Sequence, residues 1–94
     1  MQKFVYPAVV YHDEDTNTYV MTIDDLYIAG EGDSVEEAHE NVQNSLCRYI
    51  EGTIKYNLDF VEPTKFEDVR KKYPKNLVML VECNVDENKK VVRK

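Results

Sequence analysis

Residues 33–52, DSVEEAHENVQNSLCRYIEG, decide the fold of this chain. Ser34 is followed three residues later by Glu37, a capping box that satisfies free backbone N–H groups and predicts that a helix begins here. Gly52 weakens the end of this helix, but residues 53–56 can add another turn. The helix needs a sheet to cover one side, because its apolar residues recur every three or four positions: Val35, Ala38, Val42, Leu46, Tyr49 and Ile50.

Three strands are expected before this helix. Residues 3–11, KFVYPAVVY, are apolar on both faces and rich in Val and aromatic residues, which predicts a well-buried strand. Pro7 cannot donate a ladder hydrogen bond, so we expect this strand at a sheet edge or with a bulge there. Residues 18–23, TYVMTI, alternate as a second strand, and residues 27–31 form a short third strand ended by Gly30 and Gly32. The short connections predict an antiparallel meander.

A second helix and a last strand are expected after residue 56. Residues 57–63, NLDFVEP, form a connector, because the residue before a proline avoids helix. Thr64 and Glu67 repeat the capping pattern, which predicts a short helix over residues 65–73, stopped by Pro74. The last strand covers residues 77–85, with one face made of Leu77, Met79, Val81, Cys83 and Val85. The order β-β-β-α-α-β predicts an α+β domain over residues 1–86 and a basic tail over residues 87–94.

Composition and charge limit the class of protein. The chain of 94 residues is 43% hydrophobic with three Gly and three Pro, which is typical of one small globular domain. No stretch approaches the roughly 18 apolar residues of a membrane span, and the start lacks a signal-peptide pattern. We therefore expect a cytoplasmic protein that does not enter a membrane. Cys47 and Cys83 form no CxxC pair, so both are expected to be free and buried.

The net charge of −6 is unevenly distributed. No Lys or Arg lies between Lys3 and Arg48, although ten of the eighteen acidic residues do. Such a segment repels nucleic acid, whose phosphates are bound by Lys and Arg. It attracts a basic protein over a Debye length of about 8 Å. Solubility is an equally simple explanation of the charge taken alone.

The stretch HDEDTNTYV, residues 12–20, resembles part of a calcium-binding loop. Asp13, Asp15 and Asn17 take positions 1, 3 and 5 of an EF-hand, and Asp24 takes position 12. The glycine required at position 6 is Thr18 instead, and strands are expected on both sides. Asp and Asn favour the local hydrogen bonds of turns, so we expect a hairpin turn and no metal.

No catalytic set of residues is evident. His12 and His39 have no positioned Ser or Cys partner, and both are expected at the surface. The sequence contains no Gly-rich phosphate loop, zinc spacing or nucleophile elbow. We expect neither a cofactor nor an enzymatic activity.

Four segments, in order, resemble the HicB family, the antitoxins of HicA–HicB toxin–antitoxin pairs. They are YPAVVYHDEDTNTYVMTIDDL at 6–26, EGDSVEEAHENVQNSLCRYIEG at 31–52, VEPTKFED at 61–68 and LVMLVECNVD at 77–86. The resemblance covers about residues 3–86. It implies a partial RNase H-like fold and an antitoxin that occludes HicA, a small, basic, RNA-cleaving toxin. It also implies a homodimer or larger homo-oligomer.

Two departures from the family pattern matter. The family often has Asp-Leu-Pro-Gly after its second strand, whereas this chain has DDLYIAGEG at 24–32. Many members continue into a DNA-binding domain, but this chain ends in NKKVVRK, so we expect no sequence-specific DNA binding from these residues.

The residues that we expect to contact the toxin are Asp24, Asp25 and Tyr27, where an acidic cluster meets an aromatic anchor at a strand end. Two alternatives stay open. One is a metal-dependent nuclease remnant that uses Asp24, Asp25 and Asp33. The other is an adaptor whose partner is not a toxin.

Overall fold

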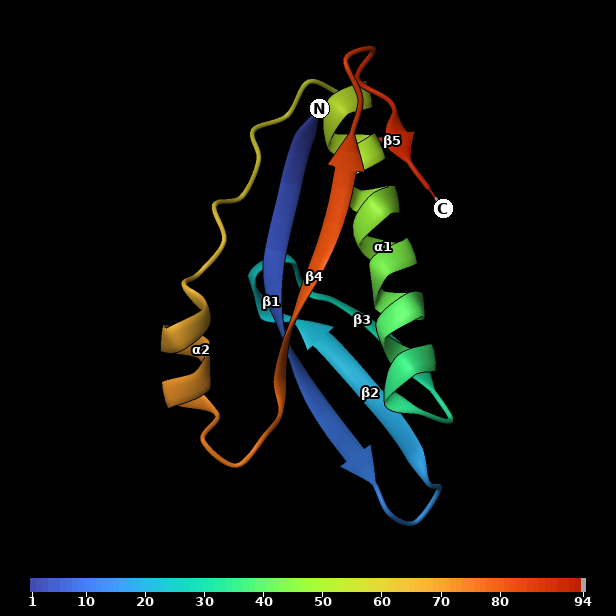
Figure 1. Cartoon of the computed structure of the whole chain (residues 1–94), viewed down its shortest axis with the longest axis vertical. Coiled ribbons are helices and arrows are strands. Elements are labelled where there is room, and N and C mark those ends of the chain that lie inside the picture. The colour runs from blue at the N-terminus through green and yellow to red at the C-terminus, as the bar shows by residue number, and fades with distance from the viewer. Residues whose placement is uncertain (94) are drawn as a thin grey trace.

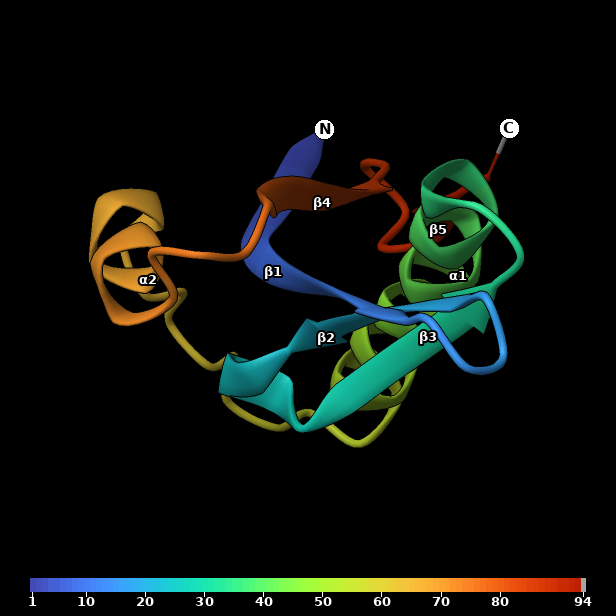
Figure 2. The same ribbon diagram turned by 90° about the horizontal axis from the view of Figure 1, so that it is seen from below.

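The computed structural model describes residues 1–93, which form a five-stranded antiparallel sheet in the order β3-β2-β1-β4-β5. The strands are β1 (Gln2–Asp13), β2 (Thr18–Ile23), β3 (Ile28–Gly32), β4 (Val78–Val85) and β5 (Val91–Val92), and the helices are α1 (Val35–Lys55) and α2 (Phe66–Lys72). The twisted sheet curls along α1, and α2 lies on the opposite side of β1 and β4 (Figures 1 and 2). The predicted α+β class and the β1–β2–β3 meander are confirmed.

Helix α1 begins and packs as its sequence predicts. The Ser34 Oγ accepts the Glu37 N–H at 3.1 Å, while the Glu37 carboxylate accepts the Asp33 N–H at 3.2 Å. The helix continues through Gly52 to Lys55. Its buried side is made of Ala38, Val42, Leu46, Cys47, Ile50 and Thr53, so two of the expected residues, Val35 and Tyr49, lie only partly buried at its border.

Two glycines let α1 lie directly on β3. A Cβ atom added at Gly30 would lie 2.2 Å from the Val42 backbone nitrogen, and one at Gly32 would lie 2.8 Å from the Ala38 nitrogen. No larger side chain fits at these distances without moving the helix backbone. The sequence predicted a strand over residues 27–31 that these glycines end. Instead, β3 covers Ile28–Gly32 and both glycines lie within it.

Polar side chains of α1 bind the outer carbonyls of both strands beside it. Such bonds satisfy edge groups that would otherwise pair with another chain. Toward β4, His39 donates to the Leu80 carbonyl at 3.1 Å and Gln43 donates to the Glu82 carbonyl at 2.9 Å. Toward β3, Asn41 donates to the Glu31 carbonyl at 2.6 Å and Ser45 donates to the Ala29 carbonyl at 3.4 Å.

The prediction for the strand that contains Pro7, an edge position or a bulge at Pro7, is wrong in both forms, because β1 is central in the sheet and its register with β4 is continuous through Pro7. Strand β1 pairs with β4 over residues 2–9 but with β2 only over residues 9–13. Pro7 thus lies in the half of β1 that has β4 alone as its neighbour. The missing N–H does not break the ladder, because Pro7 and Leu80 continue the register with β4 without interruption.

The C-terminal residues form more structure than the sequence suggested. Strand β4 begins at Val78, and Leu77, expected on its buried face, is 56% exposed. Residues 91 and 92 pair with β4 as β5, across a turn in which the Asp86 carboxylate accepts two backbone N–H groups. The proposed domain boundary at residue 86 stays a prediction. Within residues 1–93, no helix has the length and apolar character needed to cross a membrane.

Candidate functional site

The three residues expected to bind a partner follow β2 directly. Asp24–Leu26 form a short 3-10 turn, η1, anchored by the buried side chain of Leu26. Tyr27 closes this turn with φ of 55° and is 96% exposed. A non-glycine residue in the left-handed region is uncommon, and such strain tends to occur at functional positions. Tyr27 is therefore presented to solvent by a well-anchored turn.

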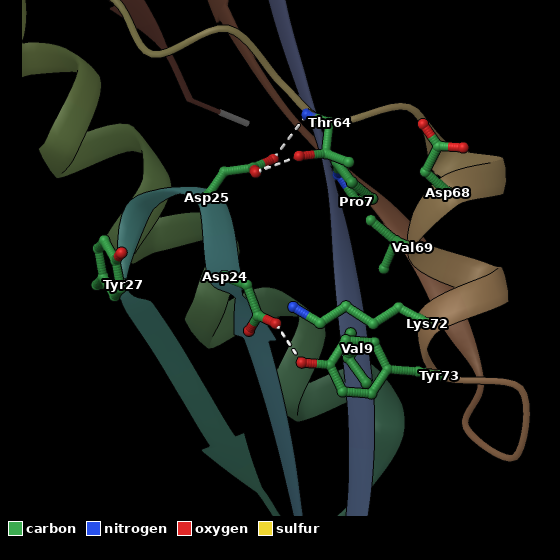
Figure 3. A pocket seen from close by; sticks show the side chains of 10 residues that line it. All are labelled: Pro7, Val9, Asp24, Asp25, Tyr27, Thr64, Asp68, Val69, Lys72 and Tyr73. Carbon is green, nitrogen blue, oxygen red and sulfur yellow. Dashed lines mark hydrogen bonds between the residues drawn. The ribbon is translucent and has the colours of Figure 1, made fainter.

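The Asp24 carboxylate is held by two hydroxyl groups. Thr22 donates to Oδ1 at 3.0 Å, and Tyr73, just after α2, donates to Oδ2 at 2.7 Å (Figure 3). The bond to Asp24, with a smaller contribution from desolvation, raises the pKa of Tyr73 to about 12. Asp24 thus joins β2 to the end of α2.

The Asp25 carboxylate holds the segment that connects the two helices. We call residues 57–65 the strap. Thr64 in the strap donates its backbone N–H to Oδ2 at 2.9 Å and its hydroxyl to Oδ1 at 2.6 Å. The prediction that Thr64 caps α2 is wrong, because the cap is Lys65 and its side chain makes no capping bond. The Thr64 hydroxyl bonds to the charged Asp25 carboxylate instead of a helix N–H group. A hydrogen bond to an ionised group is stronger than one between two neutral groups.

A cleft of about 420 Å³ separates the turn from α2. Asp24 and Asp25 point toward α2 and the strap, the Lys72 ammonium group points toward Asp24, and Tyr27 points away (Figure 3). Helix α2 has no fully buried side chain, although Val69 lines the cleft. The two aspartates therefore anchor α2 and the strap, whereas the Tyr27 side chain points into solvent.

The acidic loop after β1 is a turn, as predicted. His12 donates to the Asn17 side-chain oxygen at 2.9 Å, the Asp13 carboxylate accepts the Asp15 N–H at 3.0 Å, and Asn17 has φ of 52°. Among residues 1–93, no group of three or more His, Cys, Asp and Glu side chains is placed to hold a metal ion. Asp33 lies at the start of α1 and does not line the cleft with the other two aspartates.

The two cysteines and His39 are held within the fold. Both cysteines are free and buried, as predicted, and burial beside Cys47 raises the pKa of Cys83 to about 12. A thiol with a raised pKa is a poor nucleophile. His39 is half-buried and bonded to β4, so the prediction that it is a free surface residue is only partly correct.

The acidic residues of the N-terminal half gather at one end of the molecule. The turn between β1 and β2 and the start of α1 lie at the same end in both views (Figures 1 and 2). The exposed acids there are Asp13, Glu14, Asp15, Glu31, Asp33, Glu36, Glu37 and Glu40. We call this set the acidic end.

Sequence reasoning missed Thr64 and Tyr73 as partners of the two aspartates. Thr64 carried a signal for helix capping, and Tyr73 carried none beyond its place before Pro74. Both bonds join residues that are 39 and 49 positions apart, which no local pattern encodes.

A sheet curled along one helix, with its candidate carboxylates bonded internally and a single exposed aromatic residue on a rigid turn, is typical of a binding domain. The family model described as HicB_like antitoxin of bacterial toxin-antitoxin system matches residues 6–94. The chain belongs to this antitoxin family.

Solved structures share the fold. The N-terminal domain of the Burkholderia pseudomallei antitoxin HicB is 21% identical with a TM-score of 0.74, over 88% of this chain and 99% of that chain. A second structure of that antitoxin is 20% identical with the same score, over 93% of this chain and 67% of that chain. A chain of a toxin–antitoxin complex from Streptococcus pneumoniae is 20% identical with a TM-score of 0.71, over 86% of this chain and 69% of that chain. No curated protein matches the sequence significantly.

Proposed function

We propose that this antitoxin neutralises a small, basic, RNA-cleaving toxin of the HicA type by binding and occluding it. The membership of residues 6–94 in the HicB-like family carries the proposal. The acidic end gives a physical reason for fast and specific association, because complementary charge steers encounter with a cationic protein. An acidic surface also competes with RNA for the same basic one.

The toxin-binding surface includes the turn of Asp24, Asp25 and Tyr27. Tyr27 is the aromatic anchor, since it is exposed and its backbone is held in place by η1. The two aspartates act by fixing the turn against Thr64 and Tyr73 and add negative charge beside the anchor. Large exposed aromatic residues are enriched among those that dominate binding energy.

Further properties belong to the same proposal. The domain is a partial RNase H-like fold over residues 1–86, followed by the basic tail of residues 87–94. The protein works in the cytoplasm as a homodimer or larger homo-oligomer. It is not an enzyme and uses no cofactor. Residues 1–94 do not bind operator DNA, which a gel shift at controlled salt concentration tests directly.

Co-expression tests the proposed function. The small basic protein encoded beside this chain is expressed with and without it, and both are purified for an RNA cleavage assay. Occlusion predicts that growth is restored and that cleavage stops at a one-to-one ratio of toxin to antitoxin. Cleavage that continues with the antitoxin in excess refutes the proposal.

The alternative of a metal-dependent nuclease is less well supported, because the Asp24 and Asp25 oxygens already accept four hydrogen bonds. Titration calorimetry with magnesium or manganese, and an RNA cleavage assay of the protein alone with Asp24→Ala as control, separate the two functions. An adaptor with a different partner would leave the toxin active.

A further inference from the structure

The N-terminal half of β1 presents an unpaired strand edge. Val10 donates its N–H to the Leu77 carbonyl, in the position that follows the last pair of the β1–β4 register, Val9 opposite Val78. Bonded and non-bonded pairs alternate in an antiparallel ladder, so the N–H groups of Phe4 and Tyr6 also face β4. Those of Lys3 and Val5 face the other way.

No strand covers these outward-facing groups. The register with β2 starts only at Val9, opposite Thr22. Within residues 1–93, no hydrogen bond reaches the backbone N–H or carbonyl of Lys3 or Val5 from outside β1. Lys3 is exposed and Val5 is half-buried. This edge differs from those of β3 and β4, whose carbonyls α1 binds.

A groove lies beside this edge. The strap follows β1 from the end of α1 toward α2 (Figure 1) and contacts it where Phe60 lies 4.5 Å from Phe4 between ring centroids and Tyr6 donates to the Val61 carbonyl. The groove between residues 3–6 and residues 60–63 has a volume of about 370 Å³. In strand addition, such pockets receive the alternate side chains of the added strand.

The charge around the groove selects a cationic occupant. The strap carries two exposed acids, Asp59 and Glu62, and its one base, Lys65, lies at the end next to α2 and does not line the groove. The one base at the edge, Lys3, is paired with Glu82 at 3.5 Å. A second copy of this chain fits less well, because each copy carries a net charge of −6 and would bring its own acidic strap to the edge.

We infer that Lys3 and Val5 add an extended, cationic segment of the toxin to the sheet as a further strand, with its apolar side chains in the groove against the strap. This inference rests on the proposed function and names a docking surface for it. The surface is continuous with the turn of Asp24–Tyr27, because Thr64 at the end of the strap is bonded to Asp25. One partner can therefore contact both.

Amide hydrogen exchange tests the inference residue by residue. The labelled chain is measured alone and with a variant of the adjacent basic toxin that no longer cleaves RNA. Strand addition slows exchange at Lys3 and Val5 by about tenfold or more, because their N–H groups gain partners. Exchange at Phe4 and Tyr6 changes little, because these groups are already bonded to β4. Equal slowing at all four residues, or none at any, overturns the inference.

Two pairs of variants separate backbone pairing from charge. Val5→Pro removes the outward N–H without removing a β1–β4 bond and should weaken toxin binding about fivefold, whereas Val5→Thr keeps the N–H and should bind as the parent does. Glu62→Lys should weaken binding roughly two- to fivefold and more strongly at low salt than the same charge reversal Glu87→Lys in the turn between β4 and β5, which lies outside both the groove and the acidic end. Circular dichroism confirms that each variant is folded.

The outcomes distinguish the two proposals. A parent protein that does not bind the toxin contradicts the proposed function. A parent that binds it without slowed exchange at Lys3 and Val5 refutes only the strand addition. In the absence of toxin, exchange at Lys3 and Val5 can also be measured at rising concentrations of this chain. If both amides become more protected, a second copy binds at the edge, and the inference is overturned as well.

Discussion

The bond between Asp25 and Thr64 allows a direct test of what holds the strap. Thr64→Val replaces the hydroxyl with a methyl group of similar size and leaves the Thr64 N–H bond to Asp25 in place. The lost bond is 2.6 Å long and has a charged acceptor. Bonds to charged groups contribute about 1.5–3 kcal/mol when shielded from water. Thr64 is exposed and Asp25 only half-buried, so we expect a loss of about 1 kcal/mol.

The loss should appear in the strap and α2 before it appears in the whole domain. Helix α2 has no fully buried side chain, so it can open while the core of α1 and the sheet stays folded. Exchange of the Val69 and Tyr73 amides, both bonded within α2, should accelerate about fivefold for a change of 1 kcal/mol. Amides in the middle of α1 should exchange at the parental rate.

Thr18→Val is the matched control. The Thr18 hydroxyl lies 3.5 Å from the Thr16 carbonyl, which is too long for a strong bond, so its loss should not destabilise the protein. A double-mutant cycle of Thr64→Val with Asp25→Ala should give a coupling energy near 1 kcal/mol. Unchanged exchange in α2, or a coupling energy below about 0.3 kcal/mol, would refute the role of this bond.

The same variants decide how Asp25 serves binding. If Asp25 acts only by holding the strap, the loss of toxin binding in Thr64→Val and in Asp25→Asn should follow the loss of α2 protection that each variant causes, because Asp25→Asn alters both bonds and Thr64→Val only one. If its charge touches the toxin, Asp25→Asn should weaken binding more than its effect on α2 explains, because Thr64→Val leaves the carboxylate ionised. Titration calorimetry with the inactive toxin measures both.

Three further predictions concern packing, ionisation and the exposed anchor. Gly30→Ala should destabilise the protein by about 1–3 kcal/mol in urea unfolding because the added methyl meets the α1 backbone. Gly52→Ala, where the methyl meets nothing, should stabilise it by about 1 kcal/mol, and equal effects of the two would contradict the close contact. The pKa of Tyr73, raised from 10.0 to about 12, means that its contribution to stability is complete below pH 10 and is lost as the pH rises toward 12. Ultraviolet titration, with Tyr73→Phe to assign the Tyr73 transition apart from that of Tyr6, whose pKa burial also raises, should show that the Tyr73 transition moves back toward pH 10 in Asp24→Asn, and an unmoved Tyr73 transition would exclude Asp24 as the cause. Tyr27→Asn, which tolerates positive φ, should leave stability unchanged but weaken toxin binding about tenfold or more by titration calorimetry, and parental affinity would remove Tyr27 from the interface.

The elements that could be predicted from sequence are those specified by nearby residues. The capping pair Ser34 and Glu37 lies within one turn and was predicted correctly. The apolar face of α1 repeats within the helix itself, and four of its six expected residues are buried. The alternation of residues 18–23 likewise depends only on neighbours along the chain. For Thr64, two hydrogen-bonding choices competed, a local cap and a distant carboxylate, and only the folded arrangement of η1 and the strap decides between them.

Pro7 shows why a correct local inference led to a wrong position in the sheet. The absence of its N–H predicted a side without a neighbouring strand, and that side exists, because β2 has ended before it reaches Pro7. A single strand of twelve residues, however, has different neighbours along its two halves. The prediction treated the strand as uniform, whereas the curl of the sheet makes one strand central at one end and open at the other.

The positions of the open and closed strand edges indicate where a partner strand can bind. Four side chains of α1 bond the outer carbonyls of β3 and β4, so the strands beside the helix offer little to an incoming chain. The unpaired groups of Lys3 and Val5 lie instead next to a groove and an acidic strap. Because an exposed edge invites pairing with any extended chain, selectivity must come from its surroundings. At this edge, the acids of the strap repel RNA and a second copy of this acidic chain, and they attract a basic protein. This is the discrimination that an antitoxin needs.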